Sequence, residues 1–380
     1  MKKTRVLIQG WRGISHSYAL VNQFQLLELL KHDDLVLFHE DLPFADARWS
    51  TARSFSGFSE SDTARINAIP RADGPVDAVY RISFPYRLYG GDCRKIFCFG
   101  TSETQTLDAA CVYRGPVDQI RYANETVEIV TPSNWSKRGF VKVGAREDQV
   151  HVVPHGVDPT IFRPALPDEN VQMRARLGIP PDAFVFLSAG AMTHNKGIDK
   201  LLLAFADIHR RHRHATLLLK DQSSLYALTA KKTIAAVKLS HPGVLDAALG
   251  SIGVLSENYT LEDMRLLYGV SDAYVSPYKS EGFALTPLEA AACGVPIVVT
   301  AGGATDDYAQ PSFALKIASK LESKGAETWL EPELDSVIAC METLIEKRGA
   351  ELNPAKGAAW IAENFSWARA AEKLAALFTG

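Results

Sequence analysis

Cysteine is scarce in this sequence of 380 residues, and neither sign of charge is in clear excess. The five cysteines are odd in number and form no C-x-x-C pair, which counts against a disulfide framework and against a structural zinc site. With 41 Lys and Arg against 44 Asp and Glu, the formal net charge is −3, whereas a dedicated nucleic-acid-binding protein normally carries a basic excess. We therefore expect free thiols in a reducing compartment and no nucleic-acid partner.

Long apolar runs are also missing. The run at residues 6–8 ends at Gln9, which is far too short for the apolar core of a secretory signal. The longest stretch of low charge, residues 290–304, is interrupted by Gly294 and Pro296 and falls short of the roughly 20 residues that span a bilayer. We expect a cytoplasmic protein, and peripheral contact with the inner face of the membrane is left open.

Short apolar segments alternate with helical patterns along the chain. Strands are predicted at residues 5–9, 35–38, 76–82, 95–99, 127–130, 149–153, 184–189, 216–220, 273–276 and 296–300, with a strand or turn at 252–255. Helices are predicted from about Ser15, over 134–143 behind a capping Ser133, and over 198–209, 261–268 and 287–293. Such alternation is typical of parallel sheets with helices on both faces. Residues 40–74 lack any period and are interpreted as a long loop or a poorly regular insertion.

Four prolines within residues 154–167 interrupt this alternation, as an interdomain linker would. We therefore predict an α/β protein with two Rossmann-like, doubly wound domains, residues 1–158 and 159–362, which face each other across a cleft. Ligands of such sheets bind at the carboxyl ends of the strands, so residues that follow strands are the candidates for a site.

The densest group of candidates lies between Glu281 and Glu289, two carboxylates eight positions apart. The first stands in a loop and the second in a predicted helix, whose free N–H groups and dipole suit an anion. Residues 286–289, Thr-Pro-Leu-Glu, also fit a capping box with proline at the first helical position. Two interpretations of Glu289 therefore stay open, as a helix cap and as a binding residue.

Two lysines follow or end predicted strands in the second domain. The loop 190–197 matches neither G-x-G-x-x-G nor a P-loop, which counts against a Rossmann dehydrogenase and a Walker-type NTPase. Within it, Lys196 stands at a helix start, where the dipole disfavours a cation unless a phosphate is bound. Lys220 ends the next strand. For both lysines a solvated side chain is the alternative.

The first strand of the first domain leads into a glycine-bearing loop. Gly10 and Gly13 permit close backbone approach by a ligand, or merely form a tight turn. His16 opens the first helix and is a candidate base or hydrogen-bond donor, with an ordinary partly exposed histidine as the alternative.

Several of these segments together resemble the retaining glycosyltransferases of family 4, which have the GT-B fold. The resemblance rests on Val-Val-Pro-His-Gly-Val-Asp at 152–158, on Gly190 with Lys196-Gly197, on Glu281-x7-Glu289, on Ala-Ala-Ala-Cys-Gly-Val-Pro-Ile-Val at 290–298, and on Phe-Ser-Trp at 365–367. It covers essentially the whole chain, with specific motifs in the second domain and weak ones in the first. It implies a first domain that binds the acceptor, a second that binds a nucleotide sugar, and a C-terminal helix at 363–380 that packs back on the first.

The resemblance also implies roles for single residues. Glu281 would contact sugar hydroxyls near the reacting carbon, Glu289 would bind the ribose, and Lys196 would neutralise the diphosphate and act in catalysis with Glu281. The remaining donor contacts would come from Gly282, from the backbone N–H groups of Phe283, Ala284 and Leu285, and from Gly10, Gly13 and His16 of the first domain, with His16 also counted as catalytic. Acceptor-side candidates are Trp11, Arg12, Thr101 and Glu103.

The sequence departs from the family at two places. The family usually has an arginine just after the glycine that Gly190 matches, and here Ala191 and Met192 follow. We expect Lys220 to supply the missing cation. The family's histidine after the fourth strand is replaced by Gly-Thr-Ser-Glu at 100–103, which is why Thr101 and Glu103 are candidates.

The predicted function is transfer of a hexosyl or related sugar from a nucleotide-diphosphate sugar to a saccharide or lipid-linked hydroxyl acceptor, of the surface-polysaccharide type. No D-x-D occurs at a likely donor site, since the pair Asp306-Asp307 follows another loop, so no metal or other cofactor is expected. The resemblance implies front-face attack, and Glu281 is not assigned as a covalent nucleophile. The alternatives are a sugar-nucleotide epimerase of the same architecture and a non-catalytic nucleotide-sugar-binding protein. The sequence does not determine the sugar, the base or the oligomeric state.

Overall fold

The computed structural model describes residues 2–52, 56–107, 109–113, 126–227, 229–347 and 352–380. The chain folds into two compact units. Unit 1 comprises Met1–Gly156, Lys324–Thr328 and Phe365–Gly380, and unit 2 comprises Val157–Ser323 and Trp329–Asn364. Each unit contains a six-stranded sheet of its own.

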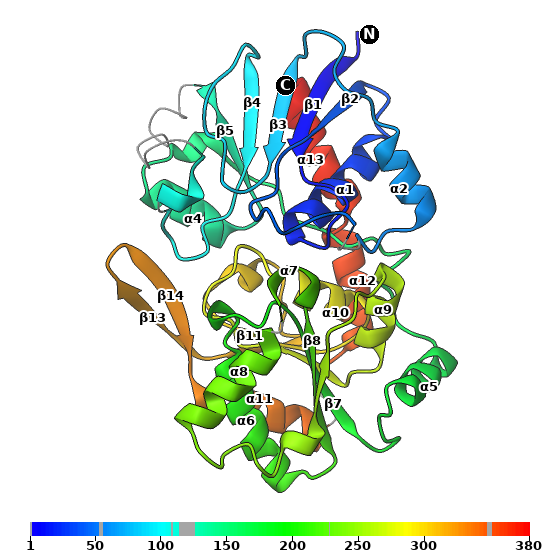
Figure 1. Ribbon diagram of the computed structural model, residues 1–380, viewed down its shortest axis with the longest axis vertical. Helices are drawn as coiled ribbons and strands as arrows, with labels where there is room; N and C mark the ends of the chain where they lie inside the picture. Colours follow the sequence, from blue (N-terminus) through cyan, green and yellow to red (C-terminus); the bar gives the residue numbers. More distant parts are fainter. Residues whose placement is uncertain (1, 53–55, 108, 114–125, 228, 348–351) are drawn as a thin grey trace. The chain divides into compact units, whose positions relative to one another are not determined.

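Unit 1 has a parallel sheet with the strand order β2-β1-β3-β4-β5-β6 (Figure 1). The strands are β1 (Thr4–Gly10), β2 (Leu35–Asp41), β3 (Ala78–Ile82), β4 (Lys95–Phe99), β5 (Glu128–Thr131) and β6 (Val150–Val152). β1 lies between β2 and β3, with its Val6 beside Leu37 on β2 and Ala78 on β3. The loop that follows β1 therefore begins where the chain order changes direction across the sheet, a place where ligands of such sheets bind.

Unit 2 has a parallel sheet with the strand order β12-β11-β10-β7-β8-β9. The strands are β7 (Phe184–Gly190), β8 (Ala215–Asp221), β9 (Ile252–Leu255), β10 (Ala273–Ser276), β11 (Ile297–Thr300) and β12 (Ala314–Ile317). A separate two-stranded sheet pairs β13 (Ser319–Lys324) with β14 (Glu327–Pro332), and its residues are divided between the units because Lys324–Thr328 belong to unit 1. The chain order reverses between β7 and β10, which is the topological switch point of a doubly wound sheet. The predicted fold class of two parallel α/β sheets is thus confirmed, whereas the facing of the two domains across a cleft stays a prediction.

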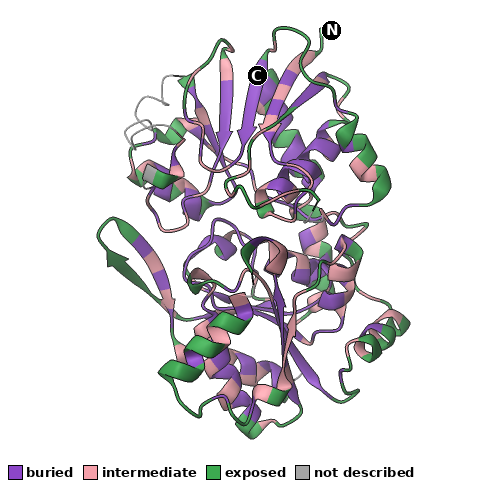
Figure 2. Ribbon diagram, in the orientation of Figure 1, coloured by how far each residue is buried: buried purple, intermediate pink, exposed green. Residues whose placement is uncertain are grey.

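The inner strands are buried on both faces because helices cover both sides of a parallel sheet. β3, β10 and β11 are buried at every position, and Figure 2 shows buried residues along most of the two large sheets. In unit 2, Phe186 of β7, Phe205 of α6 and Leu217 of β8 belong to one apolar core. This core holds the strand ends that carry the site in fixed positions.

The structure contains the helices that the alternating pattern predicts and also several that it does not, at residues 60–67, 167–176, 223–226 and 229–240. Unit 1 contains α1 (Ser17–Leu29), α2 (Glu60–Asn67), α4 (Asn134–Lys142) and α13 (Trp367–Thr379); unit 2 contains α5 (Pro167–Arg176), α6 (Ile198–Arg211), α7 (Ser223–Tyr226), α8 (Thr229–Ser240), α9 (Leu261–Gly269), α10 (Leu285–Ala292), α11 (Leu334–Lys347) and α12 (Pro354–Asn364). Among the described helices, none has the length and apolar character needed to cross a bilayer.

The prediction of a long loop over residues 40–74 is wrong, because α2 lies within it. Ser59 caps this helix by accepting a hydrogen bond from the backbone N–H of Asp62. α2 buries only Ile66. A helix with a single buried apolar residue gives no apolar period, and periodicity is the signal on which the prediction depended.

The C-terminal helix α13 packs within unit 1. The ring of Trp367 stacks on Phe24 of α1 with centroids 5.0 Å apart, and it also contacts His155 with centroids 5.6 Å apart. Gly156 permits this packing, since a Cβ there would lie 2.2 Å from the carbonyl carbon of Ser366. The backbone of residues 155–156 and the start of α13 therefore fit only without a side chain at position 156.

Gly156→Ala is expected to lower the free energy of unfolding of the full chain by about 2 kcal/mol or more, because the methyl group must displace backbone rather than a flexible side chain. Gly74→Ala is the matched control, since nothing lies within 4 Å of a Cβ at that position. Urea unfolding followed by tryptophan fluorescence measures both. A Gly156→Ala loss as small as that of the control would contradict the packing described for α13.

Candidate functional site

Two loops meet at the switch point of unit 2, where β7 and β10 end side by side. The loop after β7 carries Lys196, the loop after β10 carries Glu281, and Lys196 Nζ donates a hydrogen bond to Glu281 Oε1 in an ion pair. The side chain of Glu281 is 9% exposed and that of Lys196 is 29% exposed. The carboxylate is thus buried beneath a cation that still reaches solvent.

The turn that carries Lys196 is fixed by its backbone. A short 3₁₀ turn ends at Gly197, which has φ 64° and precedes α6. A Cβ at this position would lie 1.9 Å from the carbonyl oxygen of Pro277 in the neighbouring loop, so only glycine fits. The carbonyl of Asn195 in turn accepts a hydrogen bond of 2.7 Å from the backbone N–H of Lys279. The two loops therefore hold each other in place.

Helix α10 begins directly after the loop that carries Glu281. Ala284, the residue before the helix, has φ 69°, which is a strained conformation for any residue with a Cβ. The hydroxyl of Tyr308 donates a hydrogen bond of 2.7 Å to the carbonyl of Ala284 and supports this turn. The first N–H groups of a helix have no acceptor within it, and in α10 they begin at Leu285. The amino end of α10 is therefore a place for an anion near Lys196.

The predicted capping box is wrong. The residue at the helix cap is Ala284, and it makes no side-chain cap bond. Thr286 lies inside α10, where its hydroxyl accepts a hydrogen bond of 2.7 Å from Tyr274. Glu289 accepts one of 2.6 Å from the hydroxyl of Tyr268 rather than capping the backbone. The helix starts earlier than the Thr-Pro pattern indicates because the preceding turn is held from other elements.

The environment of Glu289 changes its acidity. Burial of the carboxyl raises its pKa to about 7, and the hydrogen bond from Tyr268 acts in the opposite direction. The residue keeps some exposed surface although its carboxyl is enclosed. Sequence reasoning missed Tyr268, which stands in α9, 21 positions earlier. A buried tyrosine needs a hydrogen-bond partner for its hydroxyl, but the sequence pattern around Tyr268 does not indicate that the partner is Glu289.

Lys220 lies at the end of β8, beside Ala189 at the end of β7. It is buried, with 6% of its surface exposed. Its Nζ donates a hydrogen bond of 3.0 Å to the carbonyl of Asp221 and lies 4.9 Å from the ring centroid of Tyr259. Burial lowers the pKa of this lysine to about 8. The alternative interpretation of Lys220 as a solvated side chain is therefore excluded, while a contact between Lys220 and a diphosphate stays a prediction.

In unit 1 the loop after β1 places glycines where side chains have no room. A Cβ at Gly10 would lie 2.7 Å from Cγ2 of Ile82. Gly13 has φ 75°, and a Cβ there would lie 2.8 Å from Cγ2 of Thr51. His16 is the N-cap of α1, and its Nδ1 accepts a hydrogen bond of 3.1 Å from the N–H of Tyr18. Burial lowers the pKa of His16 to about 4, so the ring is neutral near pH 7 and carries its proton on Nε2.

Two of the acceptor-side candidates, Trp11 and Arg12, make hydrogen bonds within unit 1. Trp11 is fully buried, and its Nε1 donates to the carbonyl of Pro43. Arg12 binds both carboxylate oxygens of Asp41, at 2.8 and 2.7 Å. These contacts account for both residues within unit 1, and a contact with an acceptor stays a prediction.

The other two candidates follow β4. The backbone N–H of Thr101 donates a hydrogen bond of 3.0 Å to the hydroxyl of Tyr86, which donates one of 2.7 Å to the Thr101 carbonyl. The carbonyl of Glu103 accepts a hydrogen bond of 2.8 Å from Nε1 of Trp135. The backbone of this loop is therefore fixed, and its side-chain roles stay predictions.

Within unit 2 the structure brings Lys196 and Glu281 together in the loops that follow β7 and β10. Helix α10 begins directly after the second loop, and Glu289 on this helix bonds to Tyr268 of α9. Lys220 follows at the end of the adjoining strand β8. The candidates of unit 1 form a second group, at the ends of β1 and β4. In the described part of the chain, no group of three or more His, Cys, Asp or Glu side chains is arranged to hold a metal ion.

Residues 170–320 match the family model described as "Glycosyl transferases group 1". This segment lies inside unit 2 and contains the site at the ends of β7 and β10. Solved glycosyltransferases share the fold of the chain, whereas the family match covers residues 170–320 alone.

Particular proteins of this class resemble the chain. D-inositol 3-phosphate glycosyltransferase 1 of Catenulispora acidiphila is 34% identical over 172 residues, which are 42% of this chain and 37% of that protein. A glycosyltransferase from Rickettsia africae superposes with a TM-score of 0.71 at 16% identity, over 100% of this chain and 98% of that one. HepE of Anabaena, solved in complex with UDP and glucose, gives a TM-score of 0.68 at 14% identity, over 99% and 100%. The solved structures show the fold alone, and this chain spans about half or less of the curated relatives' length, 37% and 49% in two cases.

The raised pKa of Glu289 predicts a pH dependence of stability. Burial disfavours the ionised carboxylate, so the folded state loses stability as pH rises above the ordinary carboxyl pKa of 4.5. The loss of stability is complete above the folded pKa of about 7. Between pH 5 and pH 8 the wild type should lose on the order of 2 kcal/mol of unfolding free energy relative to Glu289→Gln. Tyr268→Phe should enlarge this loss. Urea unfolding at several pH values tests both, and equal pH profiles for wild type and Glu289→Gln would contradict the enclosed carboxyl.

Proposed function

We propose that the protein is a retaining glycosyltransferase that moves a sugar from a nucleotide-diphosphate sugar to a hydroxyl acceptor. The observation that carries the proposal is the Lys196–Glu281 ion pair beside the amino end of α10, at the switch point of a unit that matches the glycosyltransferase family model. We infer that the base of the donor is uracil, because HepE, which shares this fold, was solved with UDP and with UDP-glucose.

The diphosphate of the donor would bind to backbone N–H groups and to a lysine side chain at the ends of β7 and β10. It would accept hydrogen bonds from backbone N–H groups at the start of α10 and would approach Lys196, whose side chain keeps solvent access. Glu281, already a partner of that lysine, would then be available to sugar hydroxyls. Glu289, ionised above a pKa of about 7, would accept hydrogen bonds from the ribose hydroxyls.

Transfer would proceed on one face of the sugar. The bond between the anomeric carbon and the phosphate oxygen breaks, the acceptor oxygen forms its bond on the same face, and the departing phosphate oxygen takes the acceptor proton. Lys196 and the amides of α10 would stabilise the negative charge that develops on the leaving diphosphate, and losing one such group costs on the order of 100-fold in rate. No metal is needed in this scheme, since protein groups supply the positive charge.

The acceptor is the less constrained part of the proposal. The family match is confined to residues 170–320, so it supports the donor side more than the acceptor side. We propose a saccharide or lipid-linked acceptor at the group of unit 1 residues after β1 and β4, in a cytoplasmic protein that meets the membrane surface when the acceptor is a lipid.

Release of UDP from UDP-sugars tests the function. With chelator present, an acceptor pool of saccharides and glycolipids should raise UDP release above the acceptor-free rate, and Lys196→Ala should lower turnover about 100-fold. Glu333→Gln is the control, because it removes the charge of an exposed carboxylate of the same unit. Conversion of the donor sugar without acceptor would show an epimerase, and donor binding without turnover in any pool would show a binding protein; either result contradicts the proposal.

Lys220 gives a second test, since we propose that it replaces the family's missing arginine. Lys220→Ala should weaken UDP binding at least tenfold below pH 8, where the wild-type amine is charged given its pKa of about 8. Lys238→Ala, on the exposed surface of α8, should leave binding unchanged. Isothermal titration with UDP measures both. Unchanged UDP affinity and turnover in Lys220→Ala would remove this lysine from the site.

A further inference from the structure

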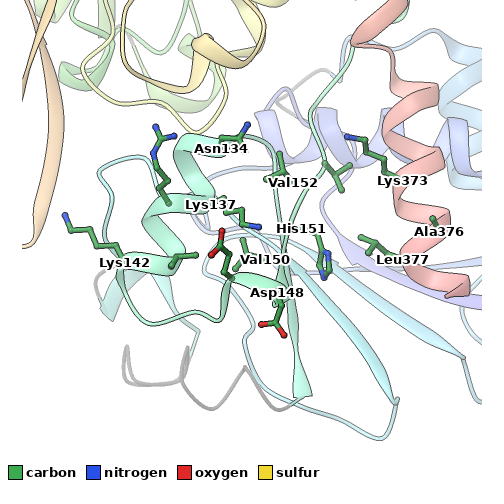
Figure 3. Close-up of a pocket in the computed structure, with 14 residues that line it drawn as sticks. Asn134, Lys137, Lys142, Asp148, Val150, His151, Val152, Lys373, Ala376 and Leu377 are labelled. Atoms are coloured by element: carbon green, nitrogen blue, oxygen red, sulfur yellow. The ribbon is translucent and has the colours of Figure 1, made fainter.

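A groove runs along β6, the last strand of the unit 1 sheet. The residues that line it all belong to unit 1, whereas Lys196, Glu281 and Glu289 belong to unit 2. The volume of the groove is about 1020 Å³, and four consecutive residues of the strand region, Val150 to Val153, line it together with side chains of α4 and α13. Figure 3 shows the strand between the two helices, with Lys137 on α4 and Lys373 on α13 to either side. We call this feature the β6 groove.

The backbone of β6 offers one residue, Val152, whose N–H and C=O both face the outer edge in this groove, since the N–H of Val150 is bonded to the carbonyl of Glu147. β6 pairs in parallel with β5, with Val152 beside Thr131. The N–H of Val153 donates to the carbonyl of Thr131, and because N–H and C=O groups alternate between the two edges of a strand, those of Val152 point to the outer edge. In the described residues the strand order ends at β6. An unpaired outer edge is a template for another strand.

The rim of the β6 groove is basic. Four cationic side chains line it, Lys137, Arg138, Lys142 and Lys373, against two acidic ones, Glu147 and Asp148. Asp148 is already paired with Arg146, through hydrogen bonds of 3.1 and 2.5 Å.

Two of the cations are uncommitted. In the part of the chain that the structure describes, neither Lys137 nor Lys373 has a side-chain ion pair or hydrogen bond, whereas Lys142 donates to the hydroxyl of Thr328. The free positive charges therefore lie on both sides of the strand, one on each helix.

The walls of the groove are apolar. Val141 of α4, Val150 and Val152 of β6, and Ala376 and Leu377 of α13 all line it. A strand placed along β6 would direct alternate side chains toward the two helices, so each face of such a strand would meet aliphatic surface below a lysine. This combination suits a peptide that carries both small apolar and acidic residues.

We propose that the β6 groove binds an extended acidic segment of a partner protein, which adds to the sheet as a seventh strand. Main-chain hydrogen bonds to the outer edge of β6 supply the pairing, the aliphatic walls accept apolar side chains, and Lys137 and Lys373 select acidic ones. The same charges repel a second basic edge, which prevents two copies from pairing through β6. The proposal goes beyond glycosyl transfer and does not depend on it.

The test uses the full chain and a labelled, end-blocked peptide of the sequence Glu-Glu-Val-Val-Glu-Glu-Val-Val, which presents both residue types on each face. Fluorescence anisotropy should show binding that is at least tenfold weaker for the same peptide with all four valines N-methylated, because methylation removes N–H donors from both of its edges. The peptide with lysine in place of glutamate should not bind.

Protein variants locate the binding. Lys137→Glu combined with Lys373→Glu should weaken peptide binding at least tenfold, and Lys137→Gln with Lys373→Gln gives a milder test that keeps the fold intact if the first pair unfolds. The control, Lys231→Glu with Lys238→Glu on exposed positions of α8, makes the same change in net charge and should bind as the wild type does.

Four results would overturn the proposal. Equal binding of the N-methylated peptide would show attraction by charge without strand pairing. Displacement of the peptide by millimolar inorganic phosphate would show a small-anion site, and displacement by phosphatidylglycerol vesicles but not by phosphatidylcholine vesicles would show a lipid surface. Equal binding by the groove and control variants would place the peptide elsewhere. UDP binding measured on the groove variants should be unchanged, which separates this result from any failure of the donor site.

Discussion

The ion pair between Lys196 and Glu281 connects the two loops on which the site of unit 2 depends. One loop follows β7 and the other follows β10, so the pair spans the switch point where the chain order of the sheet reverses. Burying a carboxylate is costly unless it is paired, and Glu281 is buried while its lysine partner reaches solvent. The pair therefore holds a cation at the surface of a site whose neighbouring groups are the amides of α10.

Other contacts make this arrangement rigid before any ligand arrives. Gly197 lets the first loop approach the carbonyl of Pro277, and Tyr308 supports the left-handed residue Ala284 at the start of α10. Tyr268 holds the carboxyl of Glu289 from the neighbouring helix α9. Preorganised groups of this kind stabilise developing charge without a cost of reorganisation during reaction.

The fold was predictable because strands buried on both faces produce short apolar runs with little ambiguity. The predicted strands at residues 184–189 and 273–276 correspond to β7 and β10, and these two strands position the site. The polar helix α2 was missed because it buries a single residue. Local patterns failed at α10 as well, where Thr286 and Glu289 look like a capping box and are instead bonded to Tyr274 and Tyr268.

Side-chain roles depended on contacts between residues distant in the chain. Nothing in the sequence around Lys220 indicates that it is buried against Tyr259, because a lysine at a strand end is more often solvated. The roles of Trp11 and Arg12 could not be inferred from their types either. Aromatic and basic residues in a loop suit a carbohydrate, yet these two contact Pro43 and Asp41 in unit 1.

The central claim is that Lys196 and the start of α10 form a binding site for the diphosphate of a nucleotide. Thermal unfolding with UDP, GDP or ADP in the presence of EDTA tests it most directly, on wild type and on Lys196→Ala, each compared with its own ligand-free sample. A nucleotide at 100 times its dissociation constant stabilises a protein by roughly 2.7 kcal/mol. The account predicts such a stabilisation of the wild type by UDP and its loss in Lys196→Ala. No stabilisation by any of the three nucleotides, or an equal one in the variant, would contradict it.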